Sequence, residues 1–449
     1  MAQPVATAYL DTARSAADWI RSTTVKTEHG LRWKPDPDRP ELETTISPPP
    51  SIYSGNAGIV LFLLELAAAT GDSTYLEEAR RGANDITASW RNVLNTSPQT
   101  PFSNALLDFQ FGLSGTAFVL LHAARATGEQ RLRDAAREII DHITAAARPA
   151  GEGVEWIGSP SVGMGEGSII LFLLWAATEL NDPALRDLSA KGGARLMELA
   201  QPDSRGGVKW VSPILENFGA PKGAYAPNFE LGTAGVAYVL ARLFEETGEQ
   251  RFLEFAQAGA AHIRALATVK NDAALLFYRE PDYPDLYYLG YCHGPVGTSR
   301  LFYQLHKLTD DPNDLEWTRK FARGITTSGA PEKQTPGLWY VVCQCCGTAG
   351  IFDYFTSLYV ATGEPAYLDY ARRTADVTAS RETNLDGKGN RWYQAWTRTK
   401  PGEVTAETGY MIGAAGVGSA YLHLHLAETG QYRATLFPDN PFPRAQPAS

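Results

Sequence analysis

The sequence has few cysteines, no long uninterrupted hydrophobic run and no excess of basic residues. Only four cysteines occur in 449 residues, and all lie between Cys292 and Cys346, so they do not form a disulfide framework for the whole chain. The 50 acidic and 40 basic side chains give a formal net charge of −10, which argues against nucleic acid as a partner. The cysteines are instead typical of a local site.

No segment has the features of a signal peptide or a membrane span. Residues Met1–Thr23 are amphipathic and include acidic side chains, whereas a signal peptide needs a basic start and an apolar core. The apolar run Ile59–Leu66 is interrupted by Glu65 and is too short to cross a bilayer. We therefore expect a cytoplasmic protein with no membrane span.

A glycine-led junction followed by an apolar run recurs seven times along the chain. The first glycines of these junctions are Gly55, Gly112, Gly165, Gly232, Gly294, Gly347 and Gly413. They lie 53 to 67 residues apart, which is room for two helices and their loops. Most junctions read Gly-x-x-Gly, and the third has the shorter Gly165–Glu166–Gly167, so each removes side chains where the chain enters a helix tightly.

The two halves of each repeat predict two kinds of helix. Runs such as Ile59–Ala69 and Ser168–Ala177 are apolar nearly all round, which indicates inner helices that are buried on every side. The segments that follow, such as Ser73–Trp90 and Glu129–Ala147, place apolar residues at helical spacing between charges and predict half-exposed outer helices.

A single hairpin cannot bury an inner helix of this kind, so the seven must pack side by side, and a ring closes the set. We predict an all-α fold, an α/α toroid of seven helical hairpins with an inner ring of seven helices within an outer ring. Residues 1–449 would form one domain. Residues 1–50 would be an N-terminal helix with an irregular covering segment, Lys34–Pro50, and residues 438–449 a flexible tail.

The repeats place the cysteines in one register. Counted back from the first glycine, Cys292 and His293 occupy positions −2 and −1 of the fifth junction, and Cys345 and Cys346 occupy the same positions of the sixth. Equivalent positions of adjacent repeats lie at the same height on neighbouring inner helices, so the two pairs face each other on one rim. Thiolate-rich surroundings favour Zn²⁺, and helix N-termini favour the thiolate form. The register therefore predicts one zinc ion per chain.

The remaining cysteine decides between two kinds of zinc site. Cys343 lies at position −4 of its junction, where the fifth junction has Gly290. We expect Cys292, Cys345 and Cys346 to bind the metal and Cys343 not to bind it, which leaves an open fourth position, as catalytic zinc requires. Two alternatives stay open: a closed structural site that includes Cys343, and cysteines that are merely buried.

On these residues the chain resembles the lanthionine synthetase C-like cyclases, whose members form an α/α toroid that carries zinc. The resemblance extends from Ser54 to about Gly430. YCHGPVG at Tyr291–Gly297 and CCGTAG at Cys345–Gly350 resemble the family's metal motifs, with a cysteine in place of the usual histidine ligand, so this looks like the three-cysteine variant. LDFQFGLSG at Leu107–Gly115 resembles the segment with the family's aspartate near the metal, here Asp108, although an aspartate before a helix is also a common N-cap.

One residue departs from the family. The histidine that the family places before the first glycine of the fourth repeat is Leu231 here, which leaves the proton-transfer role unfilled. The candidate catalytic residues are His293, Asp108 and Glu230. A histidine titrates in a suitable range, and a carboxylate beside an anionic metal site has a raised pKa. A capping role is the alternative for Glu230.

The resemblance implies a carbon–sulfur bond-forming enzyme. A cysteine thiol would add to dehydroalanine or dehydrobutyrine in a dehydrated precursor peptide, or in another substrate that contains dehydroamino acids, and would close a thioether ring. A separate dehydratase or kinase/lyase would supply that substrate. A first alternative is the addition of glutathione or another thiol, which would need basic residues such as Arg279 or Arg300. Two others are an α/α-toroid glycoside hydrolase and a non-catalytic zinc-containing scaffold.

Overall fold

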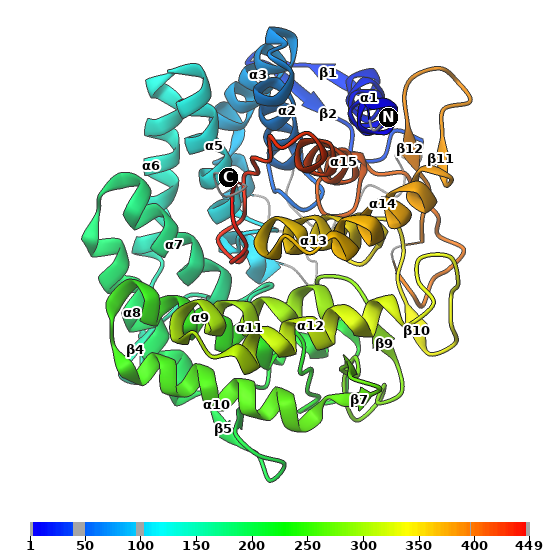
Figure 1. Ribbon diagram of the computed structural model, residues 1–449. Helices are drawn as coiled ribbons and strands as arrows, with labels where there is room; N and C mark the ends of the chain where they lie inside the picture. The colour runs from blue at the N-terminus through cyan, green and yellow to red at the C-terminus, as the bar shows by residue number, and fades with distance from the viewer. Residues whose placement is uncertain (1–2, 39–49, 96–102, 396, 446–449) are drawn as a thin grey trace.

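The computed structural model describes residues 3–38, 50–95, 103–395 and 397–445. In this part of the chain the fifteen-residue helices that follow the glycine junctions form a closed inner ring (Figure 1). These helices are α2 (Asn56–Thr70), α5 (Leu113–Thr127), α7 (Glu166–Leu180), α9 (Thr233–Thr247), α11 (Pro295–Thr309), α13 (Thr348–Thr362) and α15 (Ala414–Glu428). Each contacts the next, and α15 contacts α2. The predicted all-α toroid is confirmed.

The outer ring consists of the amphipathic helices. In chain order they are α3 (Ser73–Ser89), α6 (Gln130–Ala145), α8 (Pro183–Glu198), α10 (Gln250–Leu266), α12 (Pro312–Thr326) and α14 (Pro365–Ala379). No outer helix follows α15 in the described residues, and the N-terminal helix α1 (Gln3–Ser22) packs against α15 instead. The two ends of the chain thus complete one hairpin, which closes the outer ring (Figure 1).

The second glycine of a junction lets the preceding loop cross the first helical turn. A Cβ atom on Gly115 would lie 1.9 Å from the carbonyl oxygen of Phe109, and one on Gly350 would lie 2.1 Å from that of Gln344. Any side chain at these positions would push the loop away from the helix. The close chain entry predicted from the glycines is therefore present.

Short two-stranded ribbons lie in the loops. The antiparallel pairs are β1 (Thr24–Lys26) with β2 (Leu31–Trp33), β3 (Arg148–Ala150) with β4 (Gly153–Glu155), β5 (Gln201–Pro202) with β6 (Val208–Lys209), β7 (Thr268–Lys270) with β8 (Ala273–Leu275), and β11 (Glu382–Thr383) with β12 (Arg391–Trp392). Strands β9 (Tyr287–Tyr288) and β10 (Leu338–Trp339) pair in parallel and join the loops before α11 and α13. Short helices α4 (Asn92–Asn95), η2 (Ser103–Leu107) and η3 (Pro213–Phe218) complete the loops.

The C-terminal segment, residues 431–445, lies inside the ring and not on its surface. Figure 1 shows it in red at the centre of the inner helices. Phe437 packs against Phe109 and Phe442 against Tyr303, with ring centroids 5.4 and 4.5 Å apart. This packing inside the lumen disagrees with the flexible tail predicted from residue 438, as far as residue 445. Residues 446–449 lie outside the described residues.

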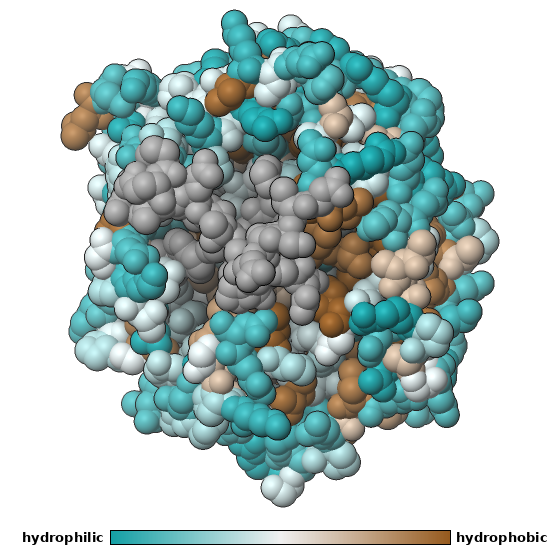
Figure 2. Space-filling view, turned by 180° about the vertical axis from the view of Figure 1, so that it is seen from behind, coloured by the Kyte–Doolittle hydropathy of each residue, from teal (hydrophilic) through white to brown (hydrophobic). Residues whose placement is uncertain are grey.

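The described helices include none that is long and apolar enough to cross a membrane. Seen from behind, the periphery of the molecule is mostly hydrophilic, and hydrophobic residues gather beside the centre (Figure 2). Of the predicted covering segment Lys34–Pro50, residues 39–49 lie outside the described residues.

Candidate metal centre

Two neighbouring junctions bring three cysteines together. The Sγ atom of Cys346 lies 3.2 Å from that of Cys292 and 3.5 Å from that of Cys345, and the three sulfurs all lie within 4.8 Å of one another. The N–H group of Cys292 donates to the carbonyl of Cys345 at 3.3 Å, so the backbone itself holds the two junctions in register. The grouping expected from the repeat register is present.

The donor set fits a thiophilic metal ion. Sulfur atoms that share one zinc ion at about 2.3 Å each lie a little under 4 Å apart, close to the spacing seen here. All three thiols are buried, and Cys346, at 7%, is the most exposed. Although burial opposes ionisation, hydrogen bonds from the other two thiols lower the pKa of Cys292 to about 7, while the pKa values of Cys345 and Cys346 are raised beside it. A cation is thus what would allow all three to ionise together.

Cys343 lies close to this group but outside it. Its side chain is fully buried, and its thiol is near enough to help raise the pKa of Cys346. The described side chains whose ligand atoms lie within 4.8 Å of one another include Cys292, Cys345 and Cys346 without Cys343. The non-ligand role of Cys343 stays a prediction, and this placement agrees with it.

The residues at position −2 of the junctions form a ring of their own. They are Tyr53, Gln110, Gly163, Glu230, Cys292, Cys345 and Met411. Around this ring the N–H group of each residue donates to the carbonyl of the next at 2.6–3.3 Å, except between Gln110 and Gly163. These bonds need no particular side chain. The fold therefore holds these seven positions at the same height, while the side chains at them differ.

Asp108 bridges the break in that ring. Its Oδ1 atom accepts from the N–H groups of Gln110 and Phe111 at 2.7 and 2.9 Å, and its Oδ2 atom accepts from the N–H group of Met164 and the hydroxyl of Ser168 at 2.8 and 2.6 Å. Burial raises the pKa of Asp108 to about 6, even though these bonds favour the carboxylate. Through these hydrogen bonds Asp108 connects the second junction to the third.

Glu230 is the acid that lies beside the cysteines. A carboxylate oxygen of Glu230, the sulfur of Cys292 and a ring nitrogen of His293 all lie within 4.8 Å of one another. The side chain has room because residue 163 is glycine, where a Cβ atom would lie 2.3 Å from the Cγ of Glu230. Burial, with the nearby Cys345 and Asp108, raises the pKa of Glu230 well above its usual value. Burial at this place therefore favours the protonated form of its carboxyl group.

His293 is enclosed by aromatic rings. Tyr278 and Tyr288 meet its ring edge-on, with centroids 4.8 and 5.6 Å away. Its buried Nδ1 atom has no hydrogen-bond partner among the described residues. Burial and the nearby Arg279 lower the pKa of His293 to about 3, which favours the neutral imidazole and disagrees with the titration near neutral pH expected from the sequence.

A comparison with protein families matches this chain to the model described as lanthionine synthetase C-like protein, over residues 106–340 and 232–437. These overlapping matches cover most of the sequence. The chain belongs to the lanthionine synthetase C-like family. A comparison with curated proteins finds no match.

The solved structure of nisin cyclase shares the fold of this family member, and two other solved structures match less well. Nisin cyclase matches with a TM-score of 0.60 at 15% identity, over 85% of this chain and 88% of that chain. A cellobiose 2-epimerase from Bacillus thermoamylovorans matches with a TM-score of 0.46 at 10% identity, over 74% and 91%. An α-1,6-mannanase from Salegentibacter sp. matches with a TM-score of 0.44 at 13% identity, over 94% and 99%.

In this member of the lanthionine synthetase C-like family, Leu231 is buried and presents no polar group at the junction before α9. Sequence reasoning missed Tyr53, whose ring stacks on Phe111 at 4.3 Å and whose pKa is raised well above its usual value by burial and the nearby Cys345 and Cys346. The signal was available, since Tyr53 shares position −2 with Cys292 and Cys345.

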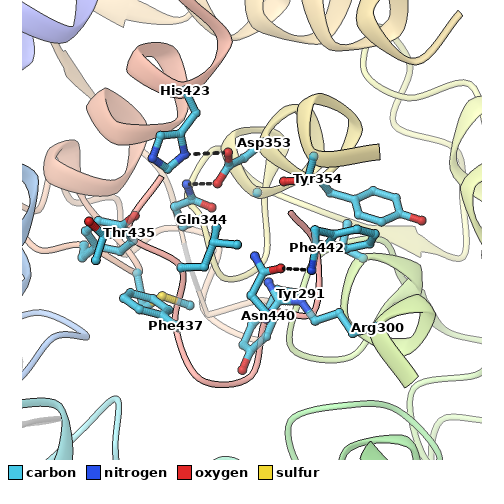
Figure 3. A pocket seen from close by; sticks show the side chains of 16 residues that line it. Tyr291, Arg300, Gln344, Asp353, Tyr354, His423, Thr435, Phe437, Asn440 and Phe442 are labelled. Carbon is cyan, nitrogen blue, oxygen red and sulfur yellow. Dashed lines mark hydrogen bonds and ion pairs between the residues drawn. The ribbon is translucent and has the colours of Figure 1, made fainter. Parts of the chain in front are cut away.

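A separate polar pocket lies in the lumen beside the C-terminal segment (Figure 3). It has about 580 Å³ of empty space, part of it open to solvent. On one side His423 binds Asp353 at 2.9 Å and Glu65 at 3.3 Å, an arrangement that raises the pKa of the imidazole well above its usual value.

On the other side of the lumen, Arg300 pairs with Asp439 at 3.0 Å, and Asp439 accepts from the hydroxyl of Tyr291 at 2.5 Å. Tyr291 directly precedes Cys292 in the chain. Arg300 is therefore tied to the C-terminal segment, and Arg279 is likewise occupied by Asp282 at 2.6 Å. Neither arginine is free to bind the carboxylates of glutathione.

Proposed function

We propose that this protein is a zinc-dependent, lanthionine cyclase-like enzyme. It would add a cysteine thiol to dehydroalanine or dehydrobutyrine in a precursor peptide that a separate dehydratase or kinase/lyase has dehydrated. The observation that carries the proposal is the convergence of Cys292, Cys345 and Cys346 on one rim of a lanthionine synthetase C-like toroid. The fold alone would not distinguish this activity from others.

Cys292, Cys345 and Cys346 would hold the metal. Zinc bound there would lower the pKa of a substrate thiol and keep it as a thiolate. Cys346 is the most exposed of the three, so we place the approach of the substrate on its side of the group. The proposed non-ligand role of Cys343 leaves the fourth position for that thiol.

The residues around the cysteines suit the proton transfer that must follow. When the sulfur bonds to the β-carbon, the electrons of the double bond move to the α-carbon, which then takes up a proton in place of the one that the thiol lost. We propose Glu230 as the donor, because its carboxyl group lies beside Cys292 and its burial favours the protonated form. His293 is the second candidate in the same group, and Asp108 would position the junctions, since both its oxygens are engaged.

The metal assignment is tested by zinc content per chain, measured by elemental analysis. We expect about one zinc in the wild type, most of it lost in Cys346→Ala and all of it retained in Cys343→Ala. Loss of zinc from Cys343→Ala but not from Cys346→Ala would contradict the proposed ligand set.

The activity is tested with a synthetic peptide that contains one dehydroalanine and one cysteine. Ring closure leaves the mass unchanged, so the product is counted as peptide that can no longer be alkylated. We expect the wild type to form it, Cys346→Ala not to, and Glu230→Gln to keep its zinc but react on the order of 10²-fold more slowly. An unchanged rate would move the proton-donor role to His293, to be tested with His293→Asn. A zinc-loaded wild type that forms no thioether, with peptide or added glutathione, would refute the enzyme and favour a scaffold.

A further inference from the structure

An aromatic surface extends outward from His293 along two junction loops, those before α11 and α13. The rings of Tyr278 and Tyr288 are stacked 4.4 Å apart at 6°, and Trp339 lies 4.6 Å from Tyr288. Tyr283 lies 5.8 Å from Tyr278. We call these four residues, Tyr278, Tyr283, Tyr288 and Trp339, the aromatic shelf. All but Tyr288 are partly exposed, so the shelf offers ring surface to a ligand beside the metal centre.

Arg398 lies at the outer end of the shelf. Its guanidinium group lies 4.6 Å from the ring centroid of Tyr283. Burial opposes its charge, whereas the nearby Tyr283 and Tyr288 raise its pKa. Among the described residues, its buried Nε atom has no hydrogen-bond partner and no carboxylate forms an ion pair with it. Arg279, on the same loops, is instead neutralised by Asp282. Arg398 is thus a half-buried cation whose charge no acid of the described chain balances.

Such a cation selects its ligand by charge. A guanidinium held against tyrosine rings keeps donors free in a fixed plane, which suits a carboxylate, while the ring faces suit an apolar neighbour. The chain as a whole carries a net charge of −10, so an acidic ligand is repelled at long range and needs a local cation to bind. The shelf therefore fits a peptide with a carboxylate next to apolar groups better than it fits a basic or sugar ligand.

We propose that Arg398 and the aromatic shelf bind a carboxylate of the substrate peptide close to its reacting residue; this rests on the proposed cyclase function. Tyr288 contacts both His293 and Arg398, so the carboxylate is held one ring away from the metal centre. That separation corresponds to about two to four residues of extended peptide. The carboxylate comes from an Asp or Glu side chain or from the C-terminus of the peptide. Arg398 is a specificity-determining residue and takes no part in the chemistry.

Binding of unreactive peptides tests this without any turnover. The probes are heptapeptides with alanine in place of dehydroalanine and serine in place of cysteine. One set has Glu, and the other Gln, two to four residues from the alanine, all with blocked ends; a third has Gln and a free C-terminus. Calorimetric titration of the zinc-loaded wild type should show one carboxylate form binding about 10-fold or more tightly than the blocked Gln form. Whichever form does so identifies the source of the carboxylate.

Variants then assign the preference to Arg398. Arg398→Gln should abolish the preference, Arg398→Lys should keep part of it, and Arg398→Glu should reverse it in favour of a Lys peptide. Arg133→Gln, on the exposed face of α6, is the matched control and should change nothing.

Two results would overturn the inference: equal binding of all forms by the wild type, or a preference that survives in Arg398→Gln. If Arg398→Gln does not fold, the wild-type comparison and Arg398→Lys still decide. A wild type that binds the acidic probe through Arg398 but closes no ring would refute the cyclase function alone.

Discussion

Phe442 tests whether the C-terminal segment is part of the core. Its side chain is 4% exposed and contacts Tyr303 and Tyr354, with ring centroids 4.5 and 5.8 Å away. Phe442→Ala would remove a whole ring from a space between inner helices α11 and α13, which cannot move inward without breaking the ring. A buried phenylalanine replaced by alanine costs about 3–5 kcal/mol, a large share of a typical stability of about 5–15 kcal/mol.

The matched control is another large hydrophobic residue, whose side chain is not buried. Leu385, between β11 and β12, is 97% exposed, so Leu385→Ala should change the free energy of unfolding by no more than about 0.5 kcal/mol. Urea unfolding, followed by far-ultraviolet circular dichroism, gives both values under one set of conditions. If Phe442→Ala were as stable as Leu385→Ala, the segment would not occupy the lumen in solution, and the flexible tail expected from the sequence would be correct.

Two further predictions concern buried charges. Asp108→Ala leaves the N–H groups of Gln110, Phe111 and Met164 without their acceptor, so we expect thermal or urea unfolding to show a loss of about 3 kcal/mol; unchanged stability with lost activity would indicate a catalytic role instead. His423→Gln leaves the buried Glu65 and the partly buried Asp353 without their cation and should cost about 3–5 kcal/mol. Because the folded state raises the pKa of His423 above its unfolded value near 6.5, that contribution is complete below pH 6.5 and is lost as the pH rises through the folded pKa. Wild-type stability should therefore fall above pH 6.5 more steeply than that of His423→Gln, and equal slopes would contradict this.

The ring of helices was predictable because its signal is local and repeated. Each inner helix begins directly after the first glycine of its junction, and several, such as those after Gly55 and Gly347, are apolar on nearly all sides. The glycine spacing therefore predicts both the helices and their register. That register in turn brings Cys292 to Cys345 and Cys346, although 53 residues separate the two junction glycines.

Features that depend on loops or on the ends of the chain were not predictable. Helix α1 comes from the opposite end of the sequence and packs against α15 to complete its hairpin. No local sequence pattern indicates that these two helices pair. The low pKa of His293 follows from burial against Tyr278 and Tyr288, which only the folded loops bring together. Arg398 reaches the same place from the loop before α15, without any periodic pattern to indicate it.

The position −2 ring explains how one repeated scaffold carries a single reaction site. Backbone hydrogen bonds fix this layer, so its side chains are free to differ from one junction to the next. Because residue 163 is glycine, there is space for the side chain of Glu230. Glu230 lies beside Cys292, and Cys292 in turn lies beside Cys345 and Cys346 of the sixth junction. A larger residue at 163 would displace the acid without touching the cysteines. The chemistry at this rim therefore depends on the order of side chains around the ring, which the fold itself leaves open.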